Sequence, residues 1–417
     1  MVHKSATLAI NEALERRLKA GEQVLHLGFG EAGLPVPDFL LNELRKSAPA
    51  NYYAPVTGDL GARQAAAGWF TRRGFPTEYQ QIMMGPGSKP LLFAAILSIE
   101  GALILPQPAW VSYAAEAEIA GIPVIRVPIT DHAGGVPDPA KLEETVKQAE
   151  RDGVRLGAIL LTIPDNPTGT VAAQQDVDEI VRIAREHDIA IISDEIYADL
   201  VYEGTAPSPL SGYPEKTIVT SGMSKNLSLG GWRIGFARFP DNAWGMRMRD
   251  TLVGIASETW SCMAAPMQAV AEYALNEPPE VKEFIAKSKR LHSTVSHAIH
   301  QIFVENGAVC REPTAAFYIY PDFDPIRERL ASENIVTSDD LAQALLSKYG
   351  IGTLQGSAFG DEPDKLRLRV ATSLVYGRTD EQRWSAYESE DPLSLPWIAR
   401  SLEFLDDGLA ALSGKRA

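Results

Sequence analysis

Short apolar runs alternate with amphipathic stretches along the chain between about residues 80 and 239. Runs rich in Ile, Val and Leu are typical of buried strands. The stretch 176–187, between two such runs, carries apolar residues three and four positions apart, as an amphipathic helix does. Alternating strands and helices predict an α/β domain with a largely parallel sheet. The expected strands include 102–106, 123–129, 157–163, 189–193 and 217–221.

The pattern changes after about Thr251. Helical stretches at 267–273 and 281–303 come first, and short apolar strands at 315–320 and 366–372 follow. This change predicts a second, smaller α+β domain.

We therefore place a large α/β domain at residues 38–275 and a small α+β domain at residues 1–37 and 276–417. The polar segment 383–397 is expected to be a loop before a final helix that ends near Leu412.

Composition and charge narrow the possible functions. The chain has 417 residues, 45% hydrophobic and 22% charged, which is enough for two packed domains. Its formal net charge of -15 would repel nucleic acid and anionic lipid, so neither is an expected partner. The longest apolar run, 91–99, is about half of what a membrane span requires. The N-terminal residues 1–22 mix charged and apolar residues at helical spacing, unlike a signal peptide.

The two cysteines, Cys262 and Cys310, lie far apart in the sequence. They match neither a disulfide framework nor a zinc cluster. We therefore expect a cytoplasmic protein without a bound metal.

Three segments that follow expected strands carry polar residues with possible chemistry. Asn166 begins the sequence Asn-Pro-Thr-Gly, and Asp194 ends an apolar strand with Tyr197 three residues later. Lys225 lies in a loop of small residues. Arg233 follows eight positions later, and Gly230 and Gly231 lie between the two. Each segment also has an ordinary interpretation, as a turn, a helix cap or a solvated charge. Open α/β sheets bind ligands beyond the carboxyl ends of their strands, however, and all three segments lie there.

The order and separations of these five residues resemble those of the class I/II aminotransferases, which are fold-type I enzymes that use pyridoxal phosphate. The likeness extends from the Gly-Phe-Gly-Glu sequence at 28–31 to the Ala-Thr-Ser sequence at 371–373. It implies a fold-type I architecture with a mostly parallel sheet in the large domain. It also implies that Lys225 holds the cofactor as a Schiff base.

The resemblance assigns roles around the cofactor ring. Lys225 would give up its bond to the cofactor when the substrate amine arrives and would then move a proton, which requires a neutral amine. Asp194 would pair with the pyridine nitrogen and keep it protonated. Asn166 and Tyr197 would hydrogen-bond the phenolic oxygen of the ring, and Asn166 would also border the substrate.

The cofactor phosphate needs a site of its own. Residues 87–89 precede a helix, and free amides at a helix N-terminus bind anions, although a turn before a core helix would look the same. The family often has a serine three residues before the lysine. Here that position is Gly222, so Ser224 or Ser221 is expected to substitute. The expected phosphate ligands are Gly87, Ser88, Lys89, Ser224 and Arg233.

Two aromatic residues follow the expected strand 102–106. Trp110 matches the family's aromatic residue that lies against the cofactor ring, although a core position is the ordinary alternative. Tyr113 is expected to be a core residue.

The substrate carboxylate requires a cation. Arg367 matches the family's arginine for this task, and Arg369, on the same face of the expected strand, is the alternative. A guanidinium can hold a carboxylate with two parallel hydrogen bonds. Gly30 resembles the glycine whose backbone faces that carboxylate.

The segment 52–63 resembles the family stretch whose tyrosine reaches the phosphate of a neighbouring subunit. That tyrosine would be Tyr53, with Tyr52 as the alternative. The resemblance therefore implies a homodimer with shared active sites, and two-fold dimers are the commonest assemblies.

The resulting hypothesis is an aminotransferase that moves an amino group between an L-amino acid and a 2-oxo acid. The alternative on the same fold is pyridoxal phosphate-dependent elimination, replacement or cyclisation. A DNA-binding regulator would need an added basic helix-turn-helix module, and a Rossmann dehydrogenase would need a GxGxxG motif after an early strand. Neither is expected here.

Overall fold

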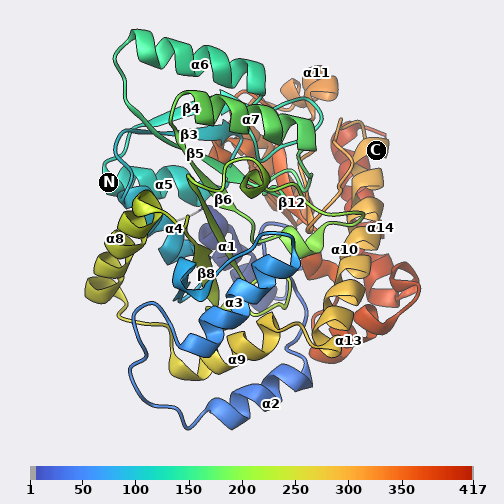
Figure 1. Ribbon diagram of the computed structural model, residues 1–417. Helices are drawn as coiled ribbons and strands as arrows, with labels where there is room; N and C mark the ends of the chain where they lie inside the picture. Colours follow the sequence, from blue (N-terminus) through green and yellow to red (C-terminus); the bar gives the residue numbers. More distant parts are fainter. Residues whose placement is uncertain (1–5, 416–417) are drawn as a thin grey trace.

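A seven-stranded sheet forms the centre of the protein, as the computed structural model shows for residues 6–415 (Figure 1). In spatial order its strands are β2 (Ile82–Gly85), β8 (Gly235–Arg238), β7 (Thr217–Gly222), β6 (Ala190–Asp194), β5 (Leu156–Thr162), β3 (Ala102–Gln107) and β4 (Val124–Pro128). β8 is antiparallel to β2 and to β7, and the other neighbouring pairs are parallel. The predicted, largely parallel sheet is confirmed.

Helices cover both faces of this sheet because alternate strand residues point to opposite sides. In β5, Ala158 and Leu160 belong to one apolar cluster, and Ile159 and Leu161 belong to another. The first cluster includes residues of α4 (Ser88–Leu97), α5 (Val111–Ala120) and α8 (Ala243–Thr259). The second includes residues of α6 (Pro139–Arg151) and α7 (Gln174–Glu186).

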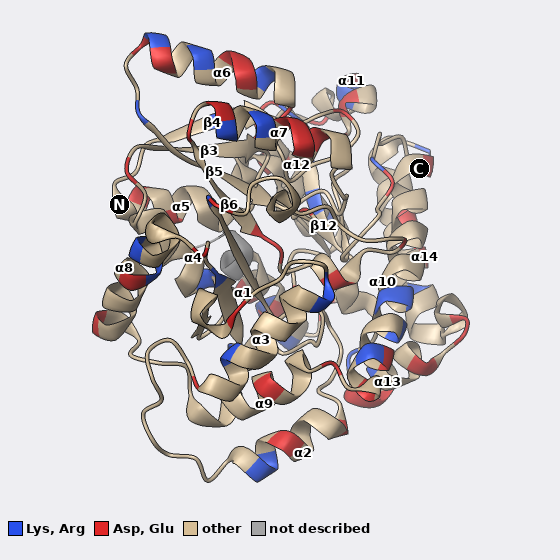
Figure 2. Ribbon diagram, in the orientation of Figure 1, with Lys and Arg blue, Asp and Glu red and all other residues tan. Residues whose placement is uncertain are grey.

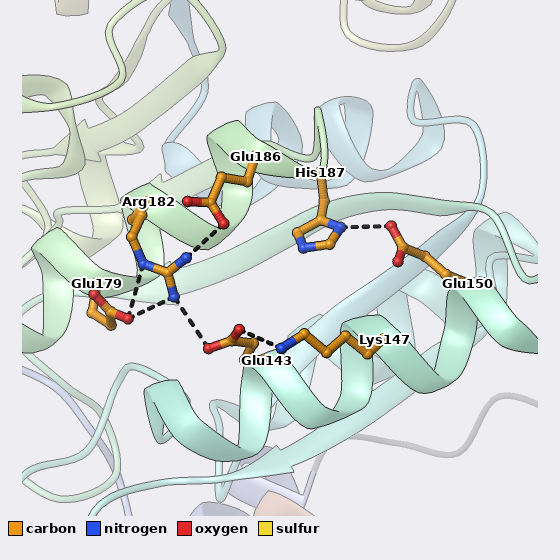
Figure 3. A network of polar contacts seen from close by, with 7 residues as sticks. All are labelled: Glu143, Lys147, Glu150, Glu179, Arg182, Glu186 and His187. Carbon is orange, nitrogen blue, oxygen red and sulfur yellow. Dashed lines mark hydrogen bonds and ion pairs between the residues drawn. The ribbon is translucent and has the colours of Figure 1, made fainter.

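Ion pairs connect α6 and α7 on their outer side (Figure 3). Arg182 of α7 contacts Glu179 and Glu186 in its own helix and reaches Glu143 of α6 at 3.1 Å. Such exposed pairs contribute little to stability, so the apolar cluster beneath them holds the two helices on the sheet. Figure 2 shows positive and negative residues interspersed along α6, α7 and α8.

A further group of helices packs beside the β2 edge. α3 (Leu60–Arg72) contacts α9 (Ala265–Leu275), which in turn contacts α2 (Asp38–Ser47). Trp69 and Phe70 of α3 are buried against Phe236 of β8.

The N-terminal and C-terminal segments build two smaller sheets. β1 (Leu25–His26) pairs in parallel with β10 (Ile351–Gly352). β12 (Leu368–Ala371) lies between β11 (Leu354–Gln355) and β9 (Tyr318–Ile319), antiparallel to both. The accompanying helices are α1 (Ala6–Lys19), α10 (Pro279–Glu305), α11 (Arg327–Ala331), α12 (Ser338–Tyr349), α13 (Asp380–Glu388) and α14 (Pro396–Ser413). The division into domains at residues 37/38 and 275/276 stays a prediction.

The segment 383–397, expected to be a loop, is partly helical. α13 covers its first six residues, and α14 begins before its end. Thr379 caps α13 by accepting a hydrogen bond from the Gln382 amide, and Tyr387 stacks on Phe284 of α10 with ring centroids 5.2 Å apart. The prediction was wrong because tertiary packing, rather than a clear apolar period, stabilises this helix.

Within residues 6–415, no helix has the length and apolar character needed to cross a membrane. The same residues contain no group of three or more His, Cys, Asp or Glu side chains that could hold a metal ion.

Candidate active site

A cavity of about 490 Å³ opens at one edge of the central sheet. β5, β6 and β7 are parallel and end at this edge, with Thr162 and Asp194 as the last residues of β5 and β6. The residues after β2 and β3 also reach it, because both strands run in the same direction as β7. The cavity therefore lies where open α/β sheets bind ligands.

Most of the residues singled out in the sequence line this cavity. They are Gly30, Ser88, Lys89, Trp110, Asn166, Asp194, Tyr197, Ser224, Lys225 and Arg233. Gly87, Tyr53 and Arg367 are not among the lining residues.

The Lys225 amine lies inside the cavity. Its Nζ donates a hydrogen bond of 2.5 Å to the Gly30 carbonyl oxygen. Burial lowers the pKa of Lys225 to about 8, and the positive charges of Arg369 and Arg233 act in the same direction. An appreciable share of this amine is therefore neutral, and hence nucleophilic, near neutral pH.

The Asp194 carboxylate forms the inner wall and is only 3% exposed. Its Oδ2 accepts a hydrogen bond of 2.8 Å from Tyr113, and its Oδ1 accepts one of 3.3 Å from the Ile196 amide. Burial raises the pKa of Asp194 to about 6. Tyr113, expected to be a core residue, is fully buried and also lines the cavity, so it holds the carboxylate in place.

Asn166, Tyr197 and Tyr318 lie close together in the cavity lining. Asn166 Nδ2 is 3.5 Å from the Tyr197 hydroxyl, and the hydroxyls of Tyr197 and Tyr318 are 2.8 Å apart. The Asn166 Oδ1 is buried and has no hydrogen-bond partner. Burial raises the pKa of Tyr197 well above its usual value, so its phenol remains neutral.

The segment 87–89 begins α4 at the other end of the cavity. Gly87 precedes the helix with φ 91°, and a Cβ at this position would lie 2.1 Å from Arg233 Nη2. Glycine is thus required for the close approach of Arg233 to the helix N-terminus. Arg233 Nη1 donates to Ser224 Oγ at 3.4 Å and to the Gly230 carbonyl at 2.9 Å. Helix amides and a guanidinium together make an anion site.

Of the two serines expected to substitute at position 222, Ser224 lines the cavity. Ser221, the other candidate, is buried and donates its hydroxyl to the Glu195 carbonyl at 3.2 Å. It does not line the cavity.

Trp110 borders the same end of the cavity. Its ring meets Tyr113 edge-on, with centroids 5.2 Å apart, and Lys89 Nζ lies 4.8 Å from the centroid of the indole. An indole in this position offers an apolar face to a flat ligand.

The structure places Arg369, the alternative, rather than the preferred Arg367 in the cavity, and the binding of the substrate carboxylate by either arginine stays a prediction. Arg369 is 1% exposed, and its Nη2 donates to the Gly28 carbonyl at 2.5 Å. Arg367 instead pairs with Asp322 at 2.8 Å and Asp361 at 3.4 Å. It pairs with Asp322 in an antiparallel bridge directly before β12, and its side chain meets these two carboxylates instead of the cavity.

Tyr53 and Tyr52 lie outside the cavity of this chain. Tyr53 is 90% exposed, and Tyr52 is 56% exposed with its hydroxyl donating to Asp59 at 3.0 Å. The contribution of Tyr53 to a neighbouring subunit stays a prediction.

Several lining residues were not anticipated, among them Tyr318, whose hydroxyl meets that of Tyr197 and whose ring lies against Arg369. Tyr318 belongs to a run expected only to be a strand, and no spacing in the sequence joins it to Tyr197. The other lining residues without a predicted role are Phe29, Glu31, Ser112, Thr162 and Ile196. Gly230 and Gly231, expected to let the backbone approach a ligand, also line the cavity.

The unpartnered atoms show what the cavity can hold. Arg369 Nε is a buried donor without a partner, which suits a carboxylate, and Asn166 Oδ1 is a buried acceptor without one. Asp194 is a buried carboxylate that a cationic ring nitrogen would compensate. With an anion site at the α4 N-terminus and the Lys225 amine between them, the cavity fits a flat phosphorylated aldehyde together with a carboxylate.

Comparisons with known proteins agree with this chemistry. Residues 22–374 match the family described as aminotransferase class I and II. The chain is 31% identical to an aspartate aminotransferase of Bacillus sp. (strain YM-2), over 89% of this chain and 93% of that protein. It is 30% identical to an asparagine–oxo-acid transaminase of Streptococcus mutans, over 90% and 94% respectively. The solved structure of the aspartate aminotransferase from Thermus thermophilus with maleate has the same fold, with a TM-score of 0.82, 24% identity, and coverage of 98% of this chain and 97% of that one.

Proposed function

Because the chain belongs to the class I and II aminotransferases, and is therefore a fold-type I pyridoxal phosphate-dependent transaminase, we propose that the cavity around Lys225 is its active site. The observation that carries this proposal is the meeting of three groups in one cavity. They are the Lys225 amine, the buried Asp194 carboxylate and the buried, partly unpartnered Arg369 guanidinium.

The residues that would hold pyridoxal phosphate follow from their chemistry. Lys225 Nζ would form the covalent link, and the amides of 88–89 with Arg233 and Ser224 would bind the phosphate. Asp194 would face the ring nitrogen, Trp110 would cover one side of the ring, and Asn166 and Tyr197 would face the phenolic oxygen. When bound, pyridoxal phosphate draws electrons away from the substrate Cα and so makes its proton acidic.

The residues of the chain then perform three tasks. Arg369 binds the α-carboxylate of the substrate and so fixes the orientation of its Cα hydrogen. Lys225, held near a pKa of about 8, takes the proton from that Cα and gives it up again. Asp194 keeps a negative charge beneath the ring, with Tyr113 and the Ile196 amide preventing it from turning away.

We propose an acidic amino acid or its amide as the amino donor. The cavity is lined by four cationic residues, Lys89, Lys225, Arg233 and Arg369, and by two acidic ones, Glu31 and Asp194. This excess of positive charge, in a chain of net charge -15, favours anionic ligands, namely the cofactor phosphate and the carboxylate of the substrate. Two of the relatives are named for aspartate and asparagine, which supports the same class of donor.

The test is a comparison of amino donors with the purified enzyme and 2-oxoglutarate. L-aspartate and L-asparagine should give kcat/KM values well above those of L-alanine, with one glutamate formed for each oxo acid released. Release of ammonia from the amino donor when no 2-oxoglutarate is added would contradict transamination at this site. Equal rates with L-alanine would contradict the proposed substrate class.

We also propose that the enzyme is a homodimer in which Tyr53 of each subunit completes the site of the other. The support is the resemblance of its segment to the family stretch, together with a large aromatic side chain that is 90% exposed in the single chain. A cytoplasmic location is proposed as well, since Cys262 and Cys310 are both free thiols.

A further inference from the structure

We propose that Tyr318 is a positioning residue of this active site, which directs the hydrogen of the Tyr197 phenol toward the cofactor and supports the Arg369 guanidinium on its ring face. The inference rests on the proposed function, because it requires the cofactor to be linked to Lys225. It concerns two parts of one side chain, the hydroxyl and the ring, which can be tested separately.

The Tyr197 and Tyr318 hydroxyls share one hydrogen bond, and each has a single hydrogen to donate. Tyr197 and Tyr318 are both buried, with their phenol oxygens 2.8 Å apart, and either can be the donor. A phenol has one hydrogen to give. If Tyr197 gives its hydrogen to the phenolic oxygen of the cofactor, Tyr318 must be the donor in the bond between the two tyrosines. Within residues 6–415 the Tyr318 hydroxyl has no other hydrogen-bond partner, so nothing there competes for its hydrogen.

Donation from Tyr318 strengthens the bond that Tyr197 makes to the cofactor. A hydroxyl that accepts a hydrogen bond becomes a better donor, and the effect is larger in a buried site of low dielectric constant. Asn166 Nδ2 can only donate, but its distance of 3.5 Å from the Tyr197 hydroxyl makes it the weaker of the two neighbours. Burial raises the pKa of Tyr318, so this residue remains a neutral donor at working pH.

The aromatic ring of Tyr318 lies against the Arg369 guanidinium. The centre of its guanidinium lies 5.1 Å from the centroid of Tyr318 and 5.3 Å from that of Phe359. Aromatic faces attract cations, most strongly where both are shielded from water. Together with the hydrogen bond to the Gly28 carbonyl, these rings hold the guanidinium while its Nε remains unpartnered.

Gly30 shows how closely Tyr318 is fitted into the site. A Cβ at residue 30 would lie 2.4 Å from the Tyr318 hydroxyl oxygen. The carbonyl of the same glycine accepts the hydrogen bond from Lys225 Nζ. Tyr318 thus contacts the Tyr197 hydroxyl, the Arg369 guanidinium and Gly30, whose carbonyl binds Lys225.

The hydroxyl is tested with Tyr318→Phe in the holoenzyme, by titrating the visible absorbance of the lysine-bound cofactor with pH. A hydrogen bond to the phenolic oxygen favours the unprotonated link, in which that oxygen bears the full negative charge. Weakening the bond should therefore raise the titration midpoint, by about half a pH unit. In a Tyr197→Phe background, Tyr318→Phe should produce no further shift, because Tyr318 acts through Tyr197.

The matched control is Tyr320→Phe. Tyr320 is also buried, but its hydroxyl donates to Asp361 at 2.8 Å, and Tyr320 does not line the cavity. Loss of the Tyr320 hydroxyl should leave the midpoint of the cofactor absorbance titration unchanged. A midpoint unmoved by Tyr318→Phe, or a shift of equal size in both backgrounds, would overturn the role of the hydroxyl alone. If the unaltered enzyme showed no absorbance of a lysine-bound cofactor, the proposed function would fail, and this inference with it.

The ring is tested by the binding of maleate, a dicarboxylate that cannot react, followed through the cofactor absorbance. Tyr318→Phe keeps the ring and should leave the Kd within about twofold, whereas Tyr318→Leu should raise it about threefold to tenfold. Thermal unfolding of both variants without cofactor would show whether each is folded. A folded Tyr318→Leu variant with unchanged affinity for maleate would refute the role of the ring.

Discussion

The most specific consequence of the structure is that Arg369→Lys should damage substrate binding far more than Arg367→Lys. Both arginines lie on one short stretch of chain, and the sequence favoured Arg367. In the structure, only Arg369 lines the cavity and has a buried, unpartnered Nε. Each replacement keeps a positive charge, so the comparison isolates the geometry of the guanidinium.

The magnitude follows from the hydrogen bonds that lysine cannot replace. A guanidinium can hold a carboxylate with two parallel bonds, and an ammonium group reproduces one of them. A hydrogen bond to a charged group contributes about 1.5–3 kcal/mol, so kcat/KM should fall about tenfold to 150-fold. The Arg367 side chain is 33% exposed and paired with Asp322 and Asp361, and such pairs contribute about 0–1 kcal/mol.

The assay is steady-state kinetics with L-aspartate and 2-oxoglutarate, together with the Kd of maleate, which reports binding alone. Arg369→Lys should raise the Kd of maleate and the KM values for both substrates. Arg367→Lys should change each value less than about threefold, and its thermal unfolding would report any loss of the ion pairs. A larger kinetic defect in Arg367→Lys than in Arg369→Lys would refute the reassignment.

Three further experiments test other parts of the structure. Asp194→Ala removes the buried charge that would face the ring nitrogen and should weaken cofactor binding about a hundredfold or more, measured by equilibrium dialysis; near-normal retention would contradict the assignment. Glu116→Gln addresses a buried carboxylate whose two oxygens have no partner and whose pKa burial raises from 4.5 to about 8. Native Glu116 keeps its proton while the unfolded chain loses it, so wild-type stability relative to the variant should fall as pH rises from 4.5 to about 8. Urea unfolding of the cofactor-free proteins should then show the variant about 1–3 kcal/mol more stable at pH 8.5, and a difference independent of pH would be the contrary result. Mixing inactive Lys225→Ala with a Tyr53→Ala variant of low activity should restore activity through hybrid dimers, because one site in each hybrid has both residues; no recovery in verified hybrids would speak against shared sites.

The sequence predicted well those elements in which the spacing of apolar residues corresponds to the residues that are buried. β5 and β6 are continuous apolar runs because helices cover both of their faces, and α7 buries its regularly spaced Val177 and Ile180. The polar residues at the carboxyl ends of β5, β6 and β7 indicated Asn166, Asp194 and Lys225 as candidates, since parallel strands bring such ends to one edge of the sheet.

Other features depend on contacts that no local pattern records. α13 is stabilised by the packing of Tyr387 on Phe284, about a hundred residues earlier in the chain. The choice between Arg367 and Arg369 depends on tertiary contacts, because Asp322 and Asp361 pair with Arg367 whereas Arg369 reaches the Gly28 carbonyl. Tyr318 belongs to the site only because β9 pairs with β12 beside it, which brings its hydroxyl to Tyr197.

The central claim, that the Lys225 amine carries the cofactor, is tested most directly by borohydride reduction of the purified enzyme, followed by proteolysis and mass spectrometry. Reduction makes the link between amine and aldehyde permanent. We expect one pyridoxyl phosphate group per chain, on the peptide that contains Lys225, and none in the Lys225→Ala variant. A label on Lys89 or on any other lysine, or no label at all, would contradict it.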